Sequence, residues 1–253
     1  CQLARPLSKW ACELKTTEEI ARVVRRAFHE ALSPPKGPVF IALPVDLLLQ
    51  PSFASGIEPP QANLVGLADV NFLKKASKAL IDAEKPCVIL GNEVSQYRAR
   101  KEAVTIVEVL GCPAFSEPIP TGVNFPNRHP QFAAVLPVDH YRASELLRNF
   151  DLILLIGMQT RLGGRFNEPP LIKETTTVIQ LNVEPGLTGC TLPCHIVASG
   201  NIAESLSRLR AEVQLISDSR WVSRVKTRAH ETVSLIAHRR QNRRIACLSK
   251  LRC

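Results

Sequence analysis

Apolar positions follow two spacings in the first fifth of the chain. Residues 20–31 carry a 3.6-residue repeat, which predicts an amphipathic helix; its apolar positions are Ile20, Val23, Val24, Ala27, Phe28 and Ala31. Thr16 and Glu19 form a capping-box pattern before it, and the prolines and glycine of SPPKG end it. GPVFIALPVDLLLQ (37–50) then holds a nearly continuous apolar run, typical of a strand buried on both faces. Residues 1–50 are therefore predicted to be the last piece of an α/β sheet.

Shorter apolar runs predict a second sheet further along the chain. The predicted strands are PCVILG (86–91), PAFS (113–116), DLILLIG (151–157), TTVIQLN (176–182) and HIVAS (195–199). Predicted helices cover 71–83 with Asn71 as N-cap, 99–110 ending at Gly111, 142–149, and 202–213. Strands alternating with helices of this length indicate a parallel sheet covered on both faces. The predicted fold class is α/β, a doubly wound parallel-sheet central domain preceded by an incomplete α/β domain.

Four segments follow from this pattern. Residues 1–50 are the piece of the first domain, and residues 51–68 are rich in Pro, Gly and Ser, which predicts a linker. Residues 69–215 form the central domain, whose length lies within the usual range of single domains. Residues 216–253 form a basic, atypical tail, because HRRQNRRIACLSKLRC shows no strand and no turn chemistry.

The net charge of +9 is concentrated in this tail. Residues 216–253 hold ten Lys or Arg against two acids, a charge of +8, which leaves +1 for residues 1–215. Two Tyr and two Trp provide no aromatic residues interleaved with the basic ones, as a single-strand binder would need. Nucleic acid is therefore not the expected partner of the central domain, and an abnormal terminus is favoured over a basic arm as the origin of the tail.

No apolar run approaches the roughly 20 residues that span a bilayer, and no signal peptide opens the chain. We expect no membrane partner and a cytoplasmic location. The chain begins with Cys1 and its only methionine is Met158, so we expect a processed form or a fragment.

The eight cysteines do not predict a disulfide scaffold in a chain of this size. Cys87 and Cys112 lie in or beside apolar runs and are interpreted as buried thiols. Cys190 and Cys194 are spaced C-x3-C with His195 next, but one such cluster lacks the second ligand pair of a structural zinc site. We interpret this segment as a loop that enters a strand.

Catalytic motifs are absent from the sequence. Neither PCVILG nor DLILLIG is followed by the G-x-G-x-x-G fingerprint of dinucleotide binding, and no phosphate-binding loop of the Walker type occurs. His129 is interpreted as a loop residue that fixes the path between two elements, and His140, next to Asp139, is not part of a dyad. Glu184 follows a predicted strand end, where ligands of such sheets bind, but a turn acid is the favoured interpretation.

Several segments occur in the order typical of one family. ARPLSKWACEL, a helix and GPVFIALPVDLL resemble the end of the pyrimidine-binding domain of thiamine-diphosphate (ThDP)-dependent enzymes. The resemblance continues into their central domain and covers about residues 1–215; it rests there on AEKPCVILGNEV, FPNRHPQF, NFDLILLIG and VIQLNVEP. RPLSKW and FPNRHPQF are closer to the benzoylformate decarboxylase type than to the acetolactate synthases.

This resemblance implies a function for the complete enzyme. It implies a 2-oxo acid decarboxylase or carboligase that uses ThDP and Mg²⁺ and acts on a small 2-oxo acid. The activating glutamate and the Gly-Asp-Gly motif of the family do not occur in this sequence. No catalytic or cofactor-binding residue is therefore assigned, and the chain alone is expected to be inactive. Its expected part is architectural, and its partners are the missing ThDP domains or a second copy in a homo-oligomer.

The resemblance also implies one metal site and two alternatives. Relatives of the benzoylformate decarboxylase type can hold a peripheral divalent ion near the RPL segment, and the matching positions are Gln2, Leu3 and Arg5. Gln2 replaces the family's Asn. One alternative makes the central domain a binding module for FAD or ADP, as in some relatives, although the missing glycine fingerprint disfavours it. The other is a catalytically dead interaction module.

Overall fold

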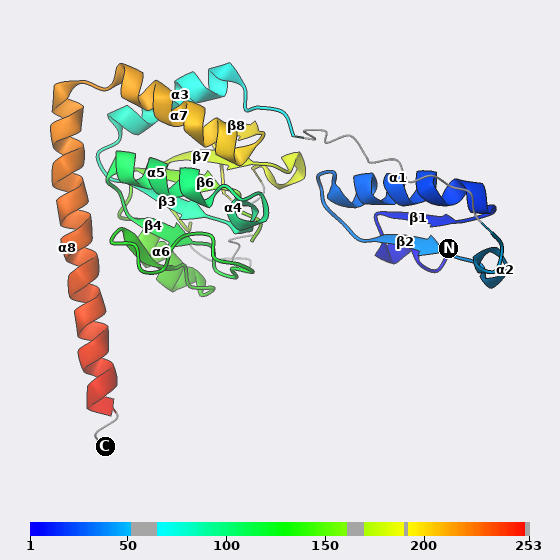
Figure 1. The fold of residues 1–253 in the computed structure, drawn as a ribbon. Helices are drawn as coiled ribbons and strands as arrows, with labels where there is room; N and C mark the ends of the chain where they lie inside the picture. Colours follow the sequence, from blue (N-terminus) through cyan, green and yellow to red (C-terminus); the bar gives the residue numbers. More distant parts are fainter. Residues whose placement is uncertain (52–64, 161–169, 190–191, 251–253) are drawn as a thin grey trace. The chain divides into compact units, whose positions relative to one another are not determined.

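The protein forms two compact units, Cys1–Val65 and Gly66–Cys253 (Figure 1). The structure, a computed structural model, describes residues 1–51, 65–160, 170–189 and 192–250, with backbone alone for 242–250. Most of the predicted linker, residues 52–64, lies outside the described residues.

The first unit is a βαβ arrangement. Two parallel strands pair in register from Trp10 with Val39 to Glu13 with Ala42, and one helix connects them. A small core packs Leu14, Val23 and Leu47 together. The elements are η1 (Arg5–Leu7), β1 (Trp10–Glu13), η2 (Thr17–Glu19), α1 (Ile20–Leu32), β2 (Val39–Ala42) and α2 (Val45–Leu48).

Three local predictions for this unit differ from the structure. Strand β1 was not predicted at all. Strand β2 is not buried on both faces, since Phe40 remains 42% exposed with only β1 beside it in the described chain. The capping box does not form, because the first turn is the 3-10 segment η2: Thr16 makes no side-chain capping bond, and Glu19 accepts instead from the amide of Lys15 at 3.4 Å.

The second unit contains a six-stranded parallel sheet in the order β5-β4-β3-β6-β7-β8. This confirms the predicted doubly wound α/β fold. Its buried central strands match the continuous apolar runs of the sequence. The strands are β3 (Pro86–Leu90), β4 (Ala114–Ser116), β5 (Phe132–Val135), β6 (Leu152–Ile156), β7 (Thr177–Asn182) and β8 (Ile196–Ser199), of which β5 was not predicted.

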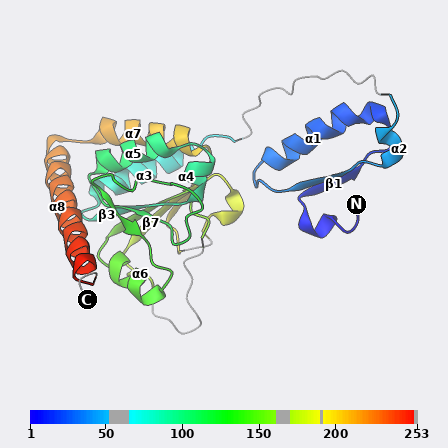
Figure 2. The ribbon, with the colours of Figure 1, turned by 60° about the horizontal axis from the view of Figure 1, so that its bottom comes forward.

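Helices cover both faces of this sheet. Helices α3 (Val70–Asp82), α5 (Arg100–Leu110) and α7 (Ile202–Ile216) lie on one face, and α6 (His140–Leu147) lies on the other (Figures 1 and 2). Two shorter segments, α4 (Asn92–Gln96) and η3 (Pro185–Leu187), follow strand ends. Gly111 ends α5 in the left-handed conformation, with φ of 63°, as predicted. The N-cap of α3 is Asp69, whose carboxylate accepts from the amide of Asn71, and not Asn71 itself.

The tail contains regular structure that the sequence did not predict. Helix α8 (Ser219–Lys250) runs along one end of the sheet (Figure 2). Its buried residues, which pack on the unit, are Trp221, Arg228, Thr232 and Ile236. Every helix among the described residues is too short or too polar to span a bilayer.

Candidate functional site: the carboxyl edge of the central sheet

The strand order of the central sheet reverses between β3 and β6. From β3 the chain proceeds to β4 and β5 on one side, and then crosses to β6, β7 and β8 on the other. Doubly wound sheets bind their ligands at such a point, beyond the carboxyl ends of the strands. Here the turn after β3 contacts the turn after β6. The backbone amide of Gly91 donates to the carbonyl of Ile156 at 2.8 Å, and a Cβ at Gly91 would collide with the backbone of Gly157 and Met158.

Glu117 closes this point from the end of β4. The residue is fully buried, and its carboxylate accepts backbone N–H groups from both turns. One oxygen accepts from Asn92 after β3, and the other accepts from Gln159 at 3.1 Å and Thr160 at 2.7 Å after β6. In nucleotide-binding sheets, backbone amides at this position face phosphate groups. In this protein an internal carboxylate already occupies three of them.

Glu93 in α4 likewise accepts hydrogen bonds, here from residues at the end of β7 and just after it. This side chain is also fully buried. Its Oε2 accepts from the amide of Val183 at 2.7 Å and from Asn182 Nδ2 at 3.0 Å, while its Oε1 accepts from the amide of Glu184 at 3.1 Å. Burial raises the pKa of Glu93 to about 7, although the hydrogen bonds to its carboxylate act in the opposite direction.

Neutral side chains complete the closure. The Asn92 Oδ1 accepts from the amide of Thr121 at 2.8 Å and from Asn124 Nδ2 at 3.2 Å, which ties the loop after β4 to the turn after β3. The amides of Gln96 and Gln159 exchange two hydrogen bonds, at 3.2 and 3.0 Å, across the reversal point. The carboxyl edge is therefore bridged by side chains from four separate segments.

This arrangement does not fit a diphosphate group. In the described part of the chain, neither Glu93 nor Glu117 has a cation within ion-pair distance, so an entering phosphate would meet two buried carboxylates. Residues 161–169, which follow β6, are outside the described residues. Within the described ranges, no group of three or more His, Cys, Asp or Glu could hold a metal ion. Among the described residues, this edge is closed by hydrogen bonds between its own side chains and turns.

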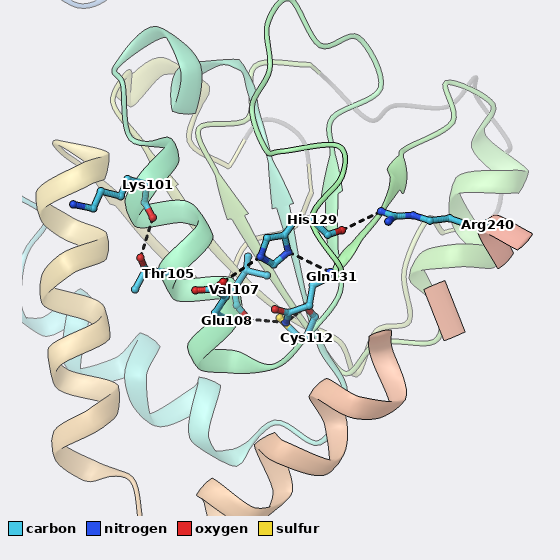
Figure 3. Close-up of polar contacts among 8 residues, drawn as sticks. All are labelled: Lys101, Thr105, Val107, Glu108, Cys112, His129, Gln131 and Arg240. Carbon is cyan, nitrogen blue, oxygen red and sulfur yellow. Dashed lines mark hydrogen bonds and ion pairs between the residues drawn. The ribbon is translucent and has the colours of Figure 1, made fainter. Parts of the chain in front are cut away.

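His129, singled out from the sequence, holds a loop in place. Figure 3 shows His129 between Glu108 and Gln131. The Oε1 of Glu108 lies 3.2 Å from the Nε2 of His129, and the backbone amide of Gln131 donates to the Nδ1 of His129 at 3.2 Å. His129 therefore fixes the path between two elements, as interpreted from the sequence. Asp139, which precedes His140 in the sequence, caps α6: its carboxylate accepts from the backbone amide of Arg142 at 2.9 Å.

The cysteine cluster has the same structural character. The Nδ1 of His195 accepts from the amide of Val178 at 3.0 Å, and the thiol of Cys194 donates to Gln180 Oε1 at 3.1 Å. Cys190 lies outside the described residues. Cys87 and Cys112 are fully buried, as predicted, and burial raises the pKa of Cys112 to about 12.

The predicted metal ligands lie in the first unit, around η1. Gln2, Leu3 and Arg5 are exposed there, Leu3 to 94%. The carbonyl of Arg5 accepts from the amide of Ser8 at 3.4 Å. As ligands, these residues would offer one side-chain amide oxygen and two main-chain carbonyls, neutral donors that suit only weak binding of Mg²⁺ or Ca²⁺. The assignment stays a prediction.

Glu93 and Glu117 were not identified from the sequence. Each follows a buried strand directly or within three residues, in VILGNE and AFSE, and Glu117 is an acid in an otherwise apolar context. An acid immediately after an apolar run is the signal that could have indicated them, because strand ends meet at one edge of a parallel sheet.

Comparison with known proteins links this chain to one family. The family model described as "Thiamine pyrophosphate enzyme, central domain" matches residues 73–209. The benzoylformate decarboxylase of Pseudomonas aeruginosa is 30% identical over 216 residues, which are 84% of this chain and 40% of that protein. An acetolactate synthase large subunit of Buchnera aphidicola is 27% identical over 214 residues, 82% of this chain and 37% of that protein.

Solved structures of similar proteins have the same fold. A thiamine-diphosphate-dependent 4-hydroxybenzoylformate decarboxylase of Rhodococcus jostii superposes with a TM-score of 0.67 at 26% identity, over 84% of this chain and 40% of that one. The benzoylformate decarboxylase of Polynucleobacter necessarius gives a TM-score of 0.69 at 21% identity, over 83% and 39%, which supports the fold alone. The chain thus spans about two fifths of the length of the relatives that it matches.

Proposed function

Since this chain belongs to the thiamine pyrophosphate enzyme family, whose central domain matches residues 73–209, we propose that it forms part of a 2-oxo acid decarboxylase or carboligase of the benzoylformate decarboxylase type. In the complete enzyme, ThDP and Mg²⁺ supply the chemistry and the protein supplies orientation and electrostatics. This chain contributes the architectural central domain and the end of the domain before it, and by itself turns over no substrate.

The closed carboxyl edge is the observation that carries the architectural role. A module for FAD or ADP needs free backbone amides or cations at the strand ends, where the diphosphate binds. Glu93 and Glu117 accept those amides internally. The same closure holds four segments rigidly together, which suits a domain that spaces two others.

The exposed apolar surface of the first unit supports a part in a larger enzyme. Phe28, Leu32, Phe40 and Leu43 are each at least 42% exposed, on α1, on β2 and directly after β2. Large exposed apolar side chains on a two-stranded sheet and its helix are expected to be covered by further strands or by a second copy. We assign this cover to the remainder of the pyrimidine-binding domain and its oligomer partner.

A domain exchange tests the architectural role. Residues 66–216 replace the corresponding segment in the benzoylformate decarboxylase of Pseudomonas aeruginosa, and benzoylformate decarboxylation is followed. Because the central domain supplies no reacting group, KM for benzoylformate should stay within about threefold of the parent value. The same exchange carrying Glu117→Ala is the matched control, and it should lower the yield of folded enzyme. A folded, ThDP-saturated chimera whose KM rises about tenfold or more would contradict the proposal.

The peripheral cation site is a second, separate proposal. Gln2, Leu3 and Arg5 would bind Mg²⁺ or Ca²⁺ weakly through neutral oxygens. Titration calorimetry with millimolar Mg²⁺ should give a small saturable heat that Gln2→Ala reduces. Absence of heat in the full chain would remove the site and leave the architectural role untouched.

A further inference from the structure

A cavity of about 710 Å³ lies between α8 and the amino edge of the central sheet. The sheet side contributes Pro86, Phe115 and Phe150, and α8 contributes Arg228, Leu235 and Ile236. Its volume lies within the roughly 300–1,000 Å³ of small-molecule pockets. The cavity is at the opposite end of the strands from the closed carboxyl edge, so the proposed function makes no use of it.

Arginines hold α8 on both sides of this cavity. Arg224 donates to the carbonyl of Ile81, and Arg228 donates to the carbonyls of Ala83 at 2.9 Å and Leu110 at 3.0 Å. These carbonyls belong to the C-terminal ends of α3 and α5, where cations are favoured by the helix dipole. Further along α8, Arg240 donates to the carbonyl of His129 at 3.0 Å (Figure 3) and to those of Asn127 and Phe132 at 3.2 and 2.9 Å. The walls of the cavity are therefore fixed in place.

Arg228 lines the cavity with a buried guanidinium whose hydrogen bonds are incomplete in the described chain. Its residue is only 8% exposed, and its Nε has no hydrogen-bond partner within the described ranges. No carboxylate of the described chain lies within ion-pair distance of it. A buried guanidinium whose hydrogen bonds go only to neutral carbonyls is costly, and burial lowers its pKa, although the Asp151 carboxylate, beyond ion-pair distance, acts in the opposite direction. An anion that enters the cavity would compensate this charge.

The rest of the wall combines an apolar floor with a positive charge balance. The rings of Phe115 and Phe150 meet edge to face with centroids 5.9 Å apart, and Ala133 and Leu146 extend this surface. Among the charged residues of the lining, four are cations and two are carboxylates. An apolar body attached to a single negative charge matches both features.

We propose that this cavity binds an apolar monocarboxylate, with its hydrocarbon or aryl body against Phe115 and Phe150 and its carboxylate against Arg228. The binding is independent of the ThDP chemistry of the complete enzyme.

Calorimetric titration of the full chain with decanoate tests the proposal. We expect saturable binding at one site, and at least about tenfold weaker binding of 1-decanol, which has the same body without the charge. Equal affinity for the two probes would contradict the carboxylate part of the proposal. No saturable heat with millimolar decanoate would overturn it.

Two variants locate the site. Leu235→Trp places a bulky ring at an exposed cavity position of α8 and should reduce decanoate affinity about tenfold or more, whereas Leu215→Trp, on the exposed surface of α7, should leave it unchanged. Arg228→Gln, checked for a cooperative unfolding transition, should weaken decanoate but not 1-decanol, and Lys226→Gln, on α8 outside the cavity, should affect neither. Decanoate binding that both cavity variants leave intact would place the ligand elsewhere and overturn the assignment.

Discussion

At the two edges of the central sheet, charges of opposite sign bind backbone groups: carboxylates bind amides at one edge, and guanidinium groups bind carbonyls at the other. At the carboxyl edge, the amides of the turns after β3, β6 and β7 are met by the internal carboxylates of Glu117 and Glu93. Near the amino edge, the last carbonyls of α3 and α5 are met by the guanidinium groups of Arg224 and Arg228. Each charge has the sign that its neighbouring backbone groups favour.

The difference lies in how completely each charge is satisfied. Both oxygens of Glu93 and of Glu117 accept backbone N–H groups, so the carboxyl edge is closed. Arg228 instead keeps one N–H group without a partner in the described chain, and it lines a cavity. In this doubly wound domain, then, the edge where ligands usually bind is occupied by internal carboxylates in the described chain, and a cavity lies at the opposite edge.

The largest effect should come from Glu117→Ala. This change leaves three backbone amides without an acceptor, one buried at Asn92 and two partly buried at Gln159 and Thr160, so the free energy of unfolding should fall by roughly 3–5 kcal/mol. Urea unfolding of the full chain measures it. Glu174→Ala, at an exposed position, is the matched control and should change stability by less than about 0.5 kcal/mol. A loss as small as the control's would mean that the carboxyl edge is not held by this carboxylate.

A pH series isolates Glu93. Its pKa of about 7 in the folded protein lies above the ordinary value of 4.5, so the folded state holds the proton more tightly. The associated stability is present below pH 4.5 and is lost as the pH rises through 7, by up to about 3 kcal/mol. Glu93→Gln should remove this slope, whereas Glu174→Gln should keep it. If the free energy of unfolding changed with pH equally in wild type and in Glu93→Gln from pH 4.5 to 8, the raised pKa of Glu93 would be contradicted.

At the amino edge, Arg228→Ala should act more moderately. It removes two hydrogen bonds to helix carbonyls but also relieves a buried charge, so we expect a net loss of roughly 2 kcal/mol. The N-terminal part of α8 should loosen, and proteolysis within α8 should become faster. Lys226→Ala on the exposed side of the same helix is the control. Unchanged proteolysis would show that α8 is held by its other contacts.

Gly111→Ala should give the smallest effect. The glycine has φ of 63°, and an added Cβ would lie 2.7 Å from the carbonyl of Val225 in α8. Left-handed strain and this contact together should cost roughly 1–2 kcal/mol. Thermal unfolding measures the loss, and Gly186→Ala, where a Cβ would meet no atom, should be close to neutral. If Gly111→Ala and Gly186→Ala lowered the stability equally, the contact between Gly111 and α8 would not contribute to it.

The sequence was sufficient where burial is continuous along the chain. Strands β3 and β6 are buried at every position, so their apolar runs predicted them well. Strands β1 and β5 were missed because each has four residues, with alanines and mixed burial that leave no clear period. Helix α8 was missed because its few buried residues, such as Trp221, Thr232 and Ile236, are widely spaced among basic ones.

The site was harder to predict, because its bonds are non-local. Glu93 accepts from Val183, 90 positions away, and Glu117 accepts from Thr160, 43 positions away. Arg228 reaches Ala83 across 145 positions. Only the folded sheet brings these groups together, so a single sequence could predict the strand ends but not which charge meets which turn.

Titration of the full chain with ADP and with FAD tests the central claim most directly. If Glu93 and Glu117 already occupy the amides of the carboxyl edge, calorimetry should show no saturable binding of either nucleotide at concentrations up to about 1 mM. The architectural role then stands. Micromolar binding of ADP or FAD that Gly157→Trp at the reversal point abolishes would contradict it, because the edge would then have to open for a diphosphate.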